Sequence, residues 1–172
     1  MSLVTPLKRT AIIVRDMQRS LQFYRDLLGM NVWIQGQAGS EIPELFRLLG
    51  VGVGAMRWYI LQSENIDWGM VGLFEIIDPM PEETHHPVSS QANRGEACLV
   101  FHTPEIDRIH QGALAMGLPV LCAPLTLVLA QHGVESREMT LRDPNGVLLN
   151  FIQNMKGGSV GLSNRFPGLR PS

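Results

Sequence analysis

Hydrophobic residues change from a strand spacing to a helix spacing along the first part of the chain. Residues 7–15 are mostly apolar and include the β-branched run AIIV, which predicts a strand. Residues 17–29 then place apolar side chains on one helical face, at Met17, Leu21, Tyr24 and Leu28. We expect the preceding Asp16 to cap the start of this helix and Gly29 to end it.

The rest of the first half predicts three more strands and a short helix. The strands are expected at residues 30–35, 55–63 and 69–77, which are rich in apolar and aromatic residues. Residues 40–50 predict a helical excursion between two of them, with a proline near its start and a glycine at its end.

The same order of elements returns in the second half. Residues 79–93 are polar, proline-rich and without a period, so we interpret them as a linker. The elements predicted after it are a strand at 96–103, a helix at 104–117, an extended segment at 119–127 broken by Pro124, and strands at 136–143 and 147–153.

The order β-α-β-β-β therefore occurs twice and predicts an α+β fold. We expect an N-terminal module at 7–78, a linker at 79–93, a C-terminal module at 94–153 and a tail at 154–172. A four-stranded sheet with a helix on one face leaves its other face uncovered. Two such βαβββ modules set edge to edge would form a cupped, partly closed mixed β-sheet around a cavity.

One polar residue interrupts the last predicted strand. Residues 143–146, Asp-Pro-Asn-Gly, predict a tight turn, and residues 147–152 are apolar apart from Asn150. An uncharged amide in such a strand is either a hydrogen-bonded core group or one wall of a binding site.

Composition and charge narrow the class of protein. The chain has 172 residues, is 45% hydrophobic and carries a formal net charge of −2, which argues against a nucleic-acid or anionic-membrane partner. No apolar run approaches the roughly 20 residues that span a bilayer, and the opening MSLVTPLKRT has no apolar core of a signal peptide. The two cysteines form no CxxC motif, so we expect a cytoplasmic protein.

Two segments carry a resemblance to a known family. AIIVRDMQRSLQFYRDLLGM and LRDPNGVLLNFIQ resemble the opening and the closing turn and strand of the vicinal oxygen chelate superfamily. That superfamily contains glyoxalase I, extradiol dioxygenases and bleomycin-resistance proteins. The resemblance implies paired βαβββ modules around a divalent metal, which chelates two neighbouring oxygens of the substrate.

The resemblance also places the four metal-ligand positions on this chain. The first, seven residues before the aspartate that opens the first helix, holds Arg9. The second lies on the fourth strand and falls on Gly72 in one register and on Glu75 in the other. The third matches Glu96 and the fourth matches Asn150.

These residue types do not suit a divalent metal. Arginine stays protonated and has no lone pair to donate, and its charge repels a cation. We therefore expect the usual metal site to be lost and no cofactor to be bound there. Arg9 and Glu96 are expected to occupy its place as an ion pair.

The same positions imply how a small molecule is held. Arg9 would receive a carboxylate or enolate oxygen, and Glu96 or Glu75 would act as a base in an enzyme. The expected cavity lining consists of Asn150, Gly72, Phe74 and Trp58, together with a lid formed by segment 36–56 in which Phe46 and Leu49 face an apolar ligand.

Two classes of function remain open from the sequence. One is a lyase- or isomerase-type enzyme that binds a small, largely apolar molecule between the modules and works without the usual metal, or a metal-dependent lyase or dioxygenase with a relocated metal. The other is a non-catalytic protein that sequesters such a molecule, as bleomycin-resistance proteins do. Modules often pair across chains in this superfamily, so we expect a homodimer.

Overall fold

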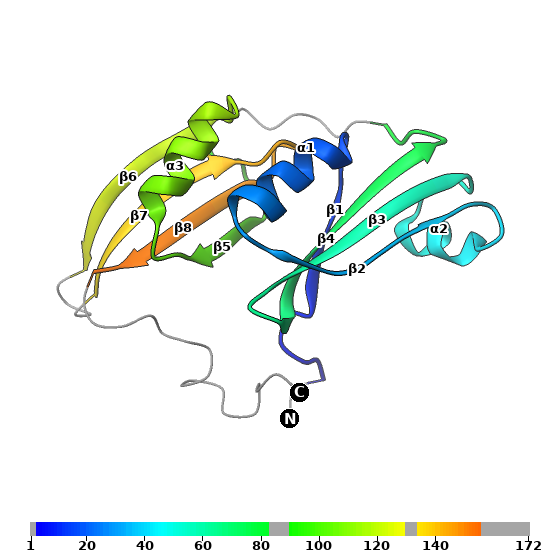
Figure 1. Cartoon of the computed structure of the whole chain (residues 1–172), viewed down its shortest axis with the longest axis horizontal. Helices are drawn as coiled ribbons and strands as arrows, with labels where there is room; N and C mark the ends of the chain where they lie inside the picture. Colours follow the sequence, from blue (N-terminus) through cyan, green and yellow to red (C-terminus); the bar gives the residue numbers. More distant parts are fainter. Residues whose placement is uncertain (1–2, 83–89, 130–133, 156–172) are drawn as a thin grey trace. The chain divides into compact units, whose positions relative to one another are not determined.

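The chain divides into two compact units at residues 84 and 85, inside the predicted linker. The computed structural model describes residues 3–82, 90–129 and 134–155 (Figure 1). Each unit contains one four-stranded sheet, and each is described by itself. The predicted tail lies outside the described residues apart from its first two positions.

The N-terminal unit contains one open mixed sheet. Its strands run in the order β1-β4-β3-β2, with β1 parallel to β4 and the other pairs antiparallel. The elements are β1 (Arg9–Ile13), α1 (Met17–Leu21), the π-helix η1 (Gln22–Leu27), β2 (Asn31–Ala38), α2 (Pro43–Leu49), β3 (Ala55–Ser63) and β4 (Ile66–Asp78).

The C-terminal unit repeats this topology. Its strands run in the order β5-β8-β7-β6, with β5 parallel to β8. The elements are β5 (Cys98–His102), α3 (Ile106–Ala115), β6 (Val120–Leu129), β7 (Val134–Arg142) and β8 (Leu148–Asn154). The α+β fold with a repeated β-α-β-β-β order is therefore confirmed, and both sheets are open rather than closed.

Two elements differ from the prediction. The first helix starts as an α-helix but continues as a π-helix from Gln22, and Phe23 and Tyr24 are both fully buried there. The segment around Pro124 is not broken, because β6 runs through the proline with a register shift between Cys122 and Leu125. Since β6 is an edge strand, it tolerates a residue without an N–H group.

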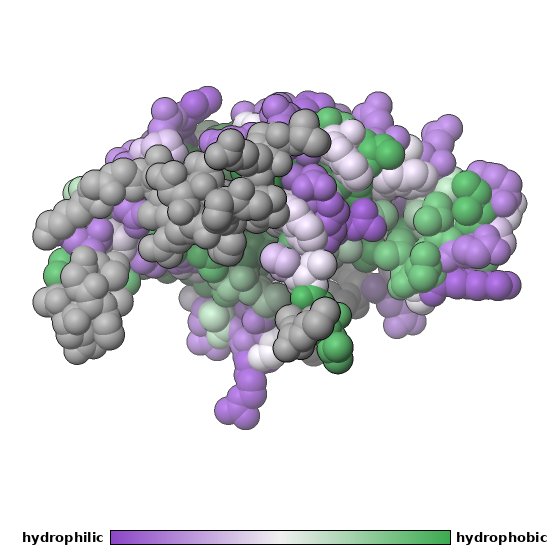
Figure 2. Space-filling view, turned by 90° about the horizontal axis from the view of Figure 1, so that it is seen from below, coloured by the Kyte–Doolittle hydropathy of each residue, from purple (hydrophilic) through white to green (hydrophobic). Residues whose placement is uncertain are grey.

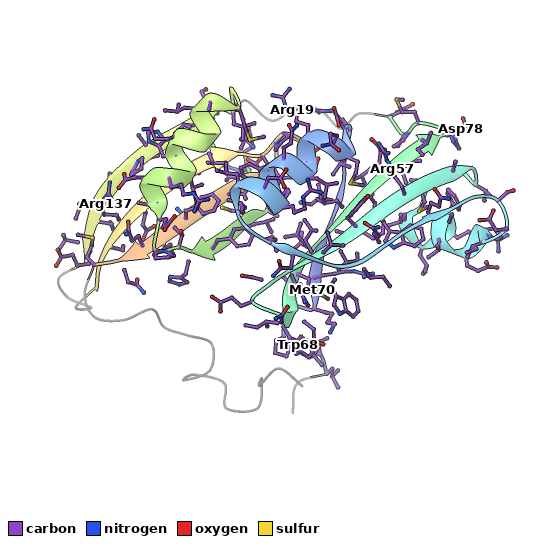
Figure 3. The ribbon with its side chains drawn as sticks, in the orientation of Figure 1. Arg19, Arg57, Trp68, Met70, Asp78 and Arg137 are labelled. Atoms are coloured by element: carbon purple, nitrogen blue, oxygen red, sulfur yellow. The ribbon has the colours of Figure 1, made fainter. Side chains whose placement is uncertain are left out.

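The helices α1 and α3 each cover one face of their sheet, and the opposite face is called the open face. In the N-terminal unit, α1 packs on β4, and the covered face is formed by buried residues such as Ile12 and Leu73. In the C-terminal unit, α3 packs on β6, β7 and β8. Arg137 on β7, labelled beside α3 in Figure 3, donates to both carboxylate oxygens of Asp107 on the helix, at 2.6 and 2.8 Å.

The helix α2 lies against the open face of the N-terminal sheet. Phe46 of α2 joins a buried cluster with Ala38, Met56 and Ile76, which come from β2, β3 and β4. Other apolar side chains of this end are exposed, and Figure 2 shows green hydrophobic residues at the surface there. α2 thus closes one end of the open face. No helix among the described residues is long and apolar enough to cross a membrane.

Candidate functional site

Three cross-strand rows on the open face of the N-terminal sheet consist of apolar residues and glycines. Residues that pair across strands point to the same face, so each row can be followed from β2 to β4 and, for two rows, to β1. The rows are Ala38–Met56–Ile76, Gly36–Trp58–Phe74–Ile13 and Ile34–Ile60–Gly72–Ala11.

Arg9 lies in the next row, where it pairs with Met70, which Figure 3 labels. Its side chain turns back toward the apolar rows. A Cβ atom placed on Gly72 would lie 2.9 Å from Cε2 of Phe74, 3.1 Å from Cδ1 of Ile60 and 3.6 Å from Cδ of Arg9. The three side chains therefore converge over Gly72 and fill the space that a side chain there would need.

The guanidinium of Arg9 is held by an aromatic ring. Its Cζ lies 5.9 Å from the centroid of the Phe74 ring, within the range of a cation–π contact. The side chain of Arg9 is exposed. Among the described residues, none offers it a carboxylate at ion-pair distance. Arg9 thus presents its positive charge at the edge of an apolar surface.

Glu75 points to the opposite face, toward the start of α1. Its Oε1 accepts a hydrogen bond from the backbone N–H of Met17 at 3.0 Å, and its Oε2 binds the guanidinium of Arg57. Gly72, and not Glu75, therefore lies on the same face of the sheet as Arg9, and the assignment of the second ligand position to it stays a prediction. The role of Glu75 as a base stays a prediction, and this position at the helix start disfavours it.

The predicted lid residues take different positions. Phe46 is fully buried inside the α2 cluster, so it supports that wall from within instead of facing a ligand. Leu49 and Trp58 are partly buried and pack against the same cluster. Trp58 also covers Gly36, where a Cβ atom would overlap its indole ring. The surface of the site is therefore formed by Trp58 and Phe74.

The internal repeat identifies the matching positions in the C-terminal unit. Arg9 is the first residue of β1 and lies eight residues before Met17, where α1 begins; Cys98 is the first residue of β5 and lies eight residues before Ile106, where α3 begins. The pairing of Ala11 with Gly72 recurs as that of Val100 with Asn150. Cys98, and not Glu96, is therefore the counterpart of Arg9. Counting eight residues back from the predicted helix start at Pro104 falls on Glu96, because α3 begins two residues later, at Ile106.

Glu96 has a partner within its own unit in place of the predicted Arg9. Its carboxylate binds both Nη atoms of the buried Arg142, and its Oε2 accepts from Asn93 N at 2.9 Å and Asn93 Nδ2 at 3.2 Å. The bond to Arg142 is the main cause that lowers the pKa of Glu96 to about 2. A carboxylate with so low a pKa is a weak base at neutral pH, so this geometry disfavours its predicted catalytic role.

Asn150 is the polar residue that interrupts the last strand. It lies on the open face of the C-terminal sheet, half-buried, and its Nδ2 donates to Oγ1 of its cross-strand partner Thr140 at 3.3 Å. On the same strand as Thr140, the hydroxyl of Ser136 donates to Oε1 of Glu138 at 2.8 Å. The sequence analysis missed these alternate polar residues of β7, Ser136, Glu138 and Thr140. The alternation of polar and other residues in SREMT signals them.

The residues at the four positions do not fit a divalent metal. Arg9 and Gly72 supply no donor atom, and the guanidinium repels a cation. Cys98 and Asn150 supply a thiol and an amide, and partial burial raises the pKa of the Cys98 thiol, which favours the weakly ligating protonated form. Within the described ranges, no three His, Cys, Asp or Glu side chains cluster as metal ligands.

A family model decides the relationship of the chain. The model of the Glyoxalase/Bleomycin resistance protein/Dioxygenase superfamily matches residues 7–151. The chain belongs to this superfamily. The match covers both sheets and agrees with the resemblance found in the sequence. A comparison with curated proteins finds no match.

Solved structures share the superfamily fold at low identity. A glyoxalase family protein from Bacillus cereus has a TM-score of 0.70 at 14% identity, over 90% of this chain and 97% of that chain. A glyoxalase/dioxygenase from Nostoc punctiforme has 0.56 at 18%, over 91% and 99%. An antibiotic binding protein from a Streptomyces species has 0.51 at 15%, over 90% and 99%. These likenesses establish the superfamily fold.

Proposed function

We propose that this protein binds a small, largely apolar organic molecule on the open face of its N-terminal sheet. The observation that carries the proposal is the composition of that face. An antiparallel sheet face turned to water normally presents polar side chains. Beyond the row that α2 buries, two successive cross-strand rows here are apolar, with Ile13 and Ile34 exposed and Trp58 and Phe74 partly exposed, and Arg9 borders them.

Sequestration is the form of this function that the chemistry of the site favours. The enzyme hypothesis needs a base, and the two carboxylates expected for it, Glu75 and Glu96, are bound to arginines and backbone groups. An antibiotic binding protein shares the fold, which supports the same choice.

A lyase- or isomerase-type enzyme is the second candidate. Arg9 favours it, because a guanidinium can stabilise an oxyanion that develops during a reaction. Turnover of a bound compound by the purified protein, abolished by Arg9→Met, would establish this candidate over sequestration.

Replacement of Phe74 tests the proposed binding face. The wild-type protein is titrated with a panel of small aromatic and aliphatic compounds by calorimetry, and the best binder is measured again with Phe74→Ala and with Leu114→Ala. Leu114 is a half-exposed residue of α3, on the helix side of the other sheet, and serves as the matched control. We expect at least a tenfold loss for Phe74→Ala only. Equal affinities in a folded Phe74→Ala protein would contradict the proposal.

A further inference from the structure

We infer that the ligand is a flat aromatic molecule with an anionic oxygen, its ring lying on Trp58 and Phe74 and its oxygen bound by Arg9. This inference rests on the proposed binding function and narrows the class of ligand. It depends on three features of the open face: two rings placed over glycines, one positive charge beside them with no carboxylate at ion-pair distance in the described part of the chain, and an apolar wall at the other end.

The two rings lie against the backbone. Trp58 and Phe74 are cross-strand partners, and each covers a glycine of a neighbouring position, Gly36 and Gly72. A Cβ atom at either glycine would meet the ring, so only glycine lets the ring lie this close to the sheet. Each side chain is partly exposed. The two rings together offer partly exposed aromatic surface, and a flat ring packed against either of them gains more than its buried area alone provides.

Arg9 supplies the charge next to this surface. It is the only charged residue among the strand residues paired with the three apolar rows and the row that follows. Its backbone lies four residues from Ile13, the partner of Phe74, yet its guanidinium reaches the Phe74 ring at 5.9 Å. The guanidinium therefore lies against the ring of Phe74, on the side of the face away from α2. A carboxylate, phenolate or enolate on a stacked ring would meet it with a charge-assisted bond.

The apolar wall formed by α2 determines which end of the ligand points toward α2 and which end points toward Arg9. Leu45, Leu49 and Val51 pack around the buried cluster at the end of the face opposite to Arg9. An anionic group placed at that end would lose its hydration without a partner. A cationic ligand would be repelled by Arg9. The arrangement therefore selects a molecule with its apolar ring toward α2 and its negative oxygen toward Arg9.

Three naphthalene probes of nearly equal shape test the inference. The full chain is titrated by calorimetry with 2-naphthoate, neutral 2-naphthamide and cationic 2-naphthylmethylammonium. We expect 2-naphthoate to bind best, by about tenfold to a hundredfold over the amide, as for a hydrogen bond to a charged group. Arg9→Met should lower its affinity to that of the amide, and Arg9→Lys should retain part of the difference. Arg108→Met, which removes an exposed arginine from α3, should change nothing.

The outcomes separate this inference from the function on which it rests. If the amide and 2-naphthoate bind equally, or if Arg9→Met leaves their ratio unchanged, the anionic class is overturned while binding on this face stands. If no probe binds at millimolar concentration, both proposals fall. If 2-naphthoate binds but Phe74→Ala has no effect, the anion is held elsewhere and the placement of the ring is wrong.

Discussion

The bond network around Arg142 should control the stability of the C-terminal unit. Arg142 is 2% exposed and holds four acceptors together: both oxygens of Glu96, the carbonyl of Gly146 at 2.7 Å and the carbonyl of Gln91 at 2.8 Å. It therefore ties the segment before β5 to the turn that opens β8. The perturbations are Glu96→Gln, Arg142→Met and the double variant.

The pKa of Glu96 gives the size of the contribution that its bond to Arg142 makes to the free energy of unfolding. A shift from 4.5 to about 2 corresponds to about 3 kcal/mol of differential stabilisation. Because the pKa is lower in the folded state, the contribution is complete above about pH 4.5 and is lost as the pH falls toward 2. Removing either partner of this buried pair should cost about 3 kcal/mol, and the double variant should recover about 1–3 kcal/mol of the summed loss.

The assay has to report on the unfolding of the C-terminal unit. The three tryptophans, at 33, 58 and 68, all lie in the N-terminal unit, so their fluorescence follows that unit alone. Unfolding in urea is therefore followed by circular dichroism, and amide hydrogen exchange is measured on peptides covering 90–96 and 142–147. Both peptides should lose protection in Glu96→Gln, and peptides of β3 should not.

An exposed ion pair supplies the control. Glu105 binds Arg108 at 3.0 Å, but their side chains are 56% and 71% exposed, so Glu105→Gln should cost less than about 0.5 kcal/mol. The reasoning would be refuted by additive effects of the two single changes at Glu96 and Arg142. A Glu96→Gln protein as stable as Glu105→Gln at pH 7, with the same acid unfolding profile as wild type, would refute it equally.

Three further outcomes can be checked independently. We expect no stoichiometric Zn, Ni, Mn or Fe in the purified protein; elemental analysis finding one ion per chain that survives chelator dialysis and is lost in Cys98→Ser would contradict this. Glu75→Ala should destabilise the N-terminal unit by about 1–2 kcal/mol in urea, monitored by tryptophan fluorescence, because the N–H of Met17 loses its acceptor, and an unchanged midpoint would be inconsistent with that role. We expect a homodimer by light scattering at micromolar concentration, against which a monomeric mass would count.

Helix ends were predictable because their signals are local. Asp16 accepts a hydrogen bond from the N–H of Arg19 at 3.0 Å, as a capping residue does. Gly29, Gly50 and Gly117 have positive φ angles of 74°, 69° and 67°, which glycine adopts without strain where a helix ends. The sequence also predicted the order of helices and strands along the chain, because each element is recognised from apolar residues spaced over only a few positions.

Positions that depend on distant contacts were not predictable in the same way. The alternation along β4 separates Gly72 from Glu75 but does not say which face the helix covers, and the bond to Met17 decides it. Glu96 was placed two residues too early because the start of β5 is not marked in the sequence. Its partner Arg142 is 46 residues away, a separation that no local pattern encodes.

The filled hollow over Gly72 has a consequence for how this chain can change. Glycine and glutamate codons can differ by one base, so the usual carboxylate of the second ligand position is close in genetic terms. In the folded protein a glutamate side chain has no space at position 72, because Phe74, Ile60 and Arg9 already occupy the space over the glycine. Metal chelation at this position would require moving these side chains and replacing Arg9 as well. Each of those steps alone removes part of the apolar surface before a metal could be held, so the packing around this one glycine keeps a single substitution from creating a metal site.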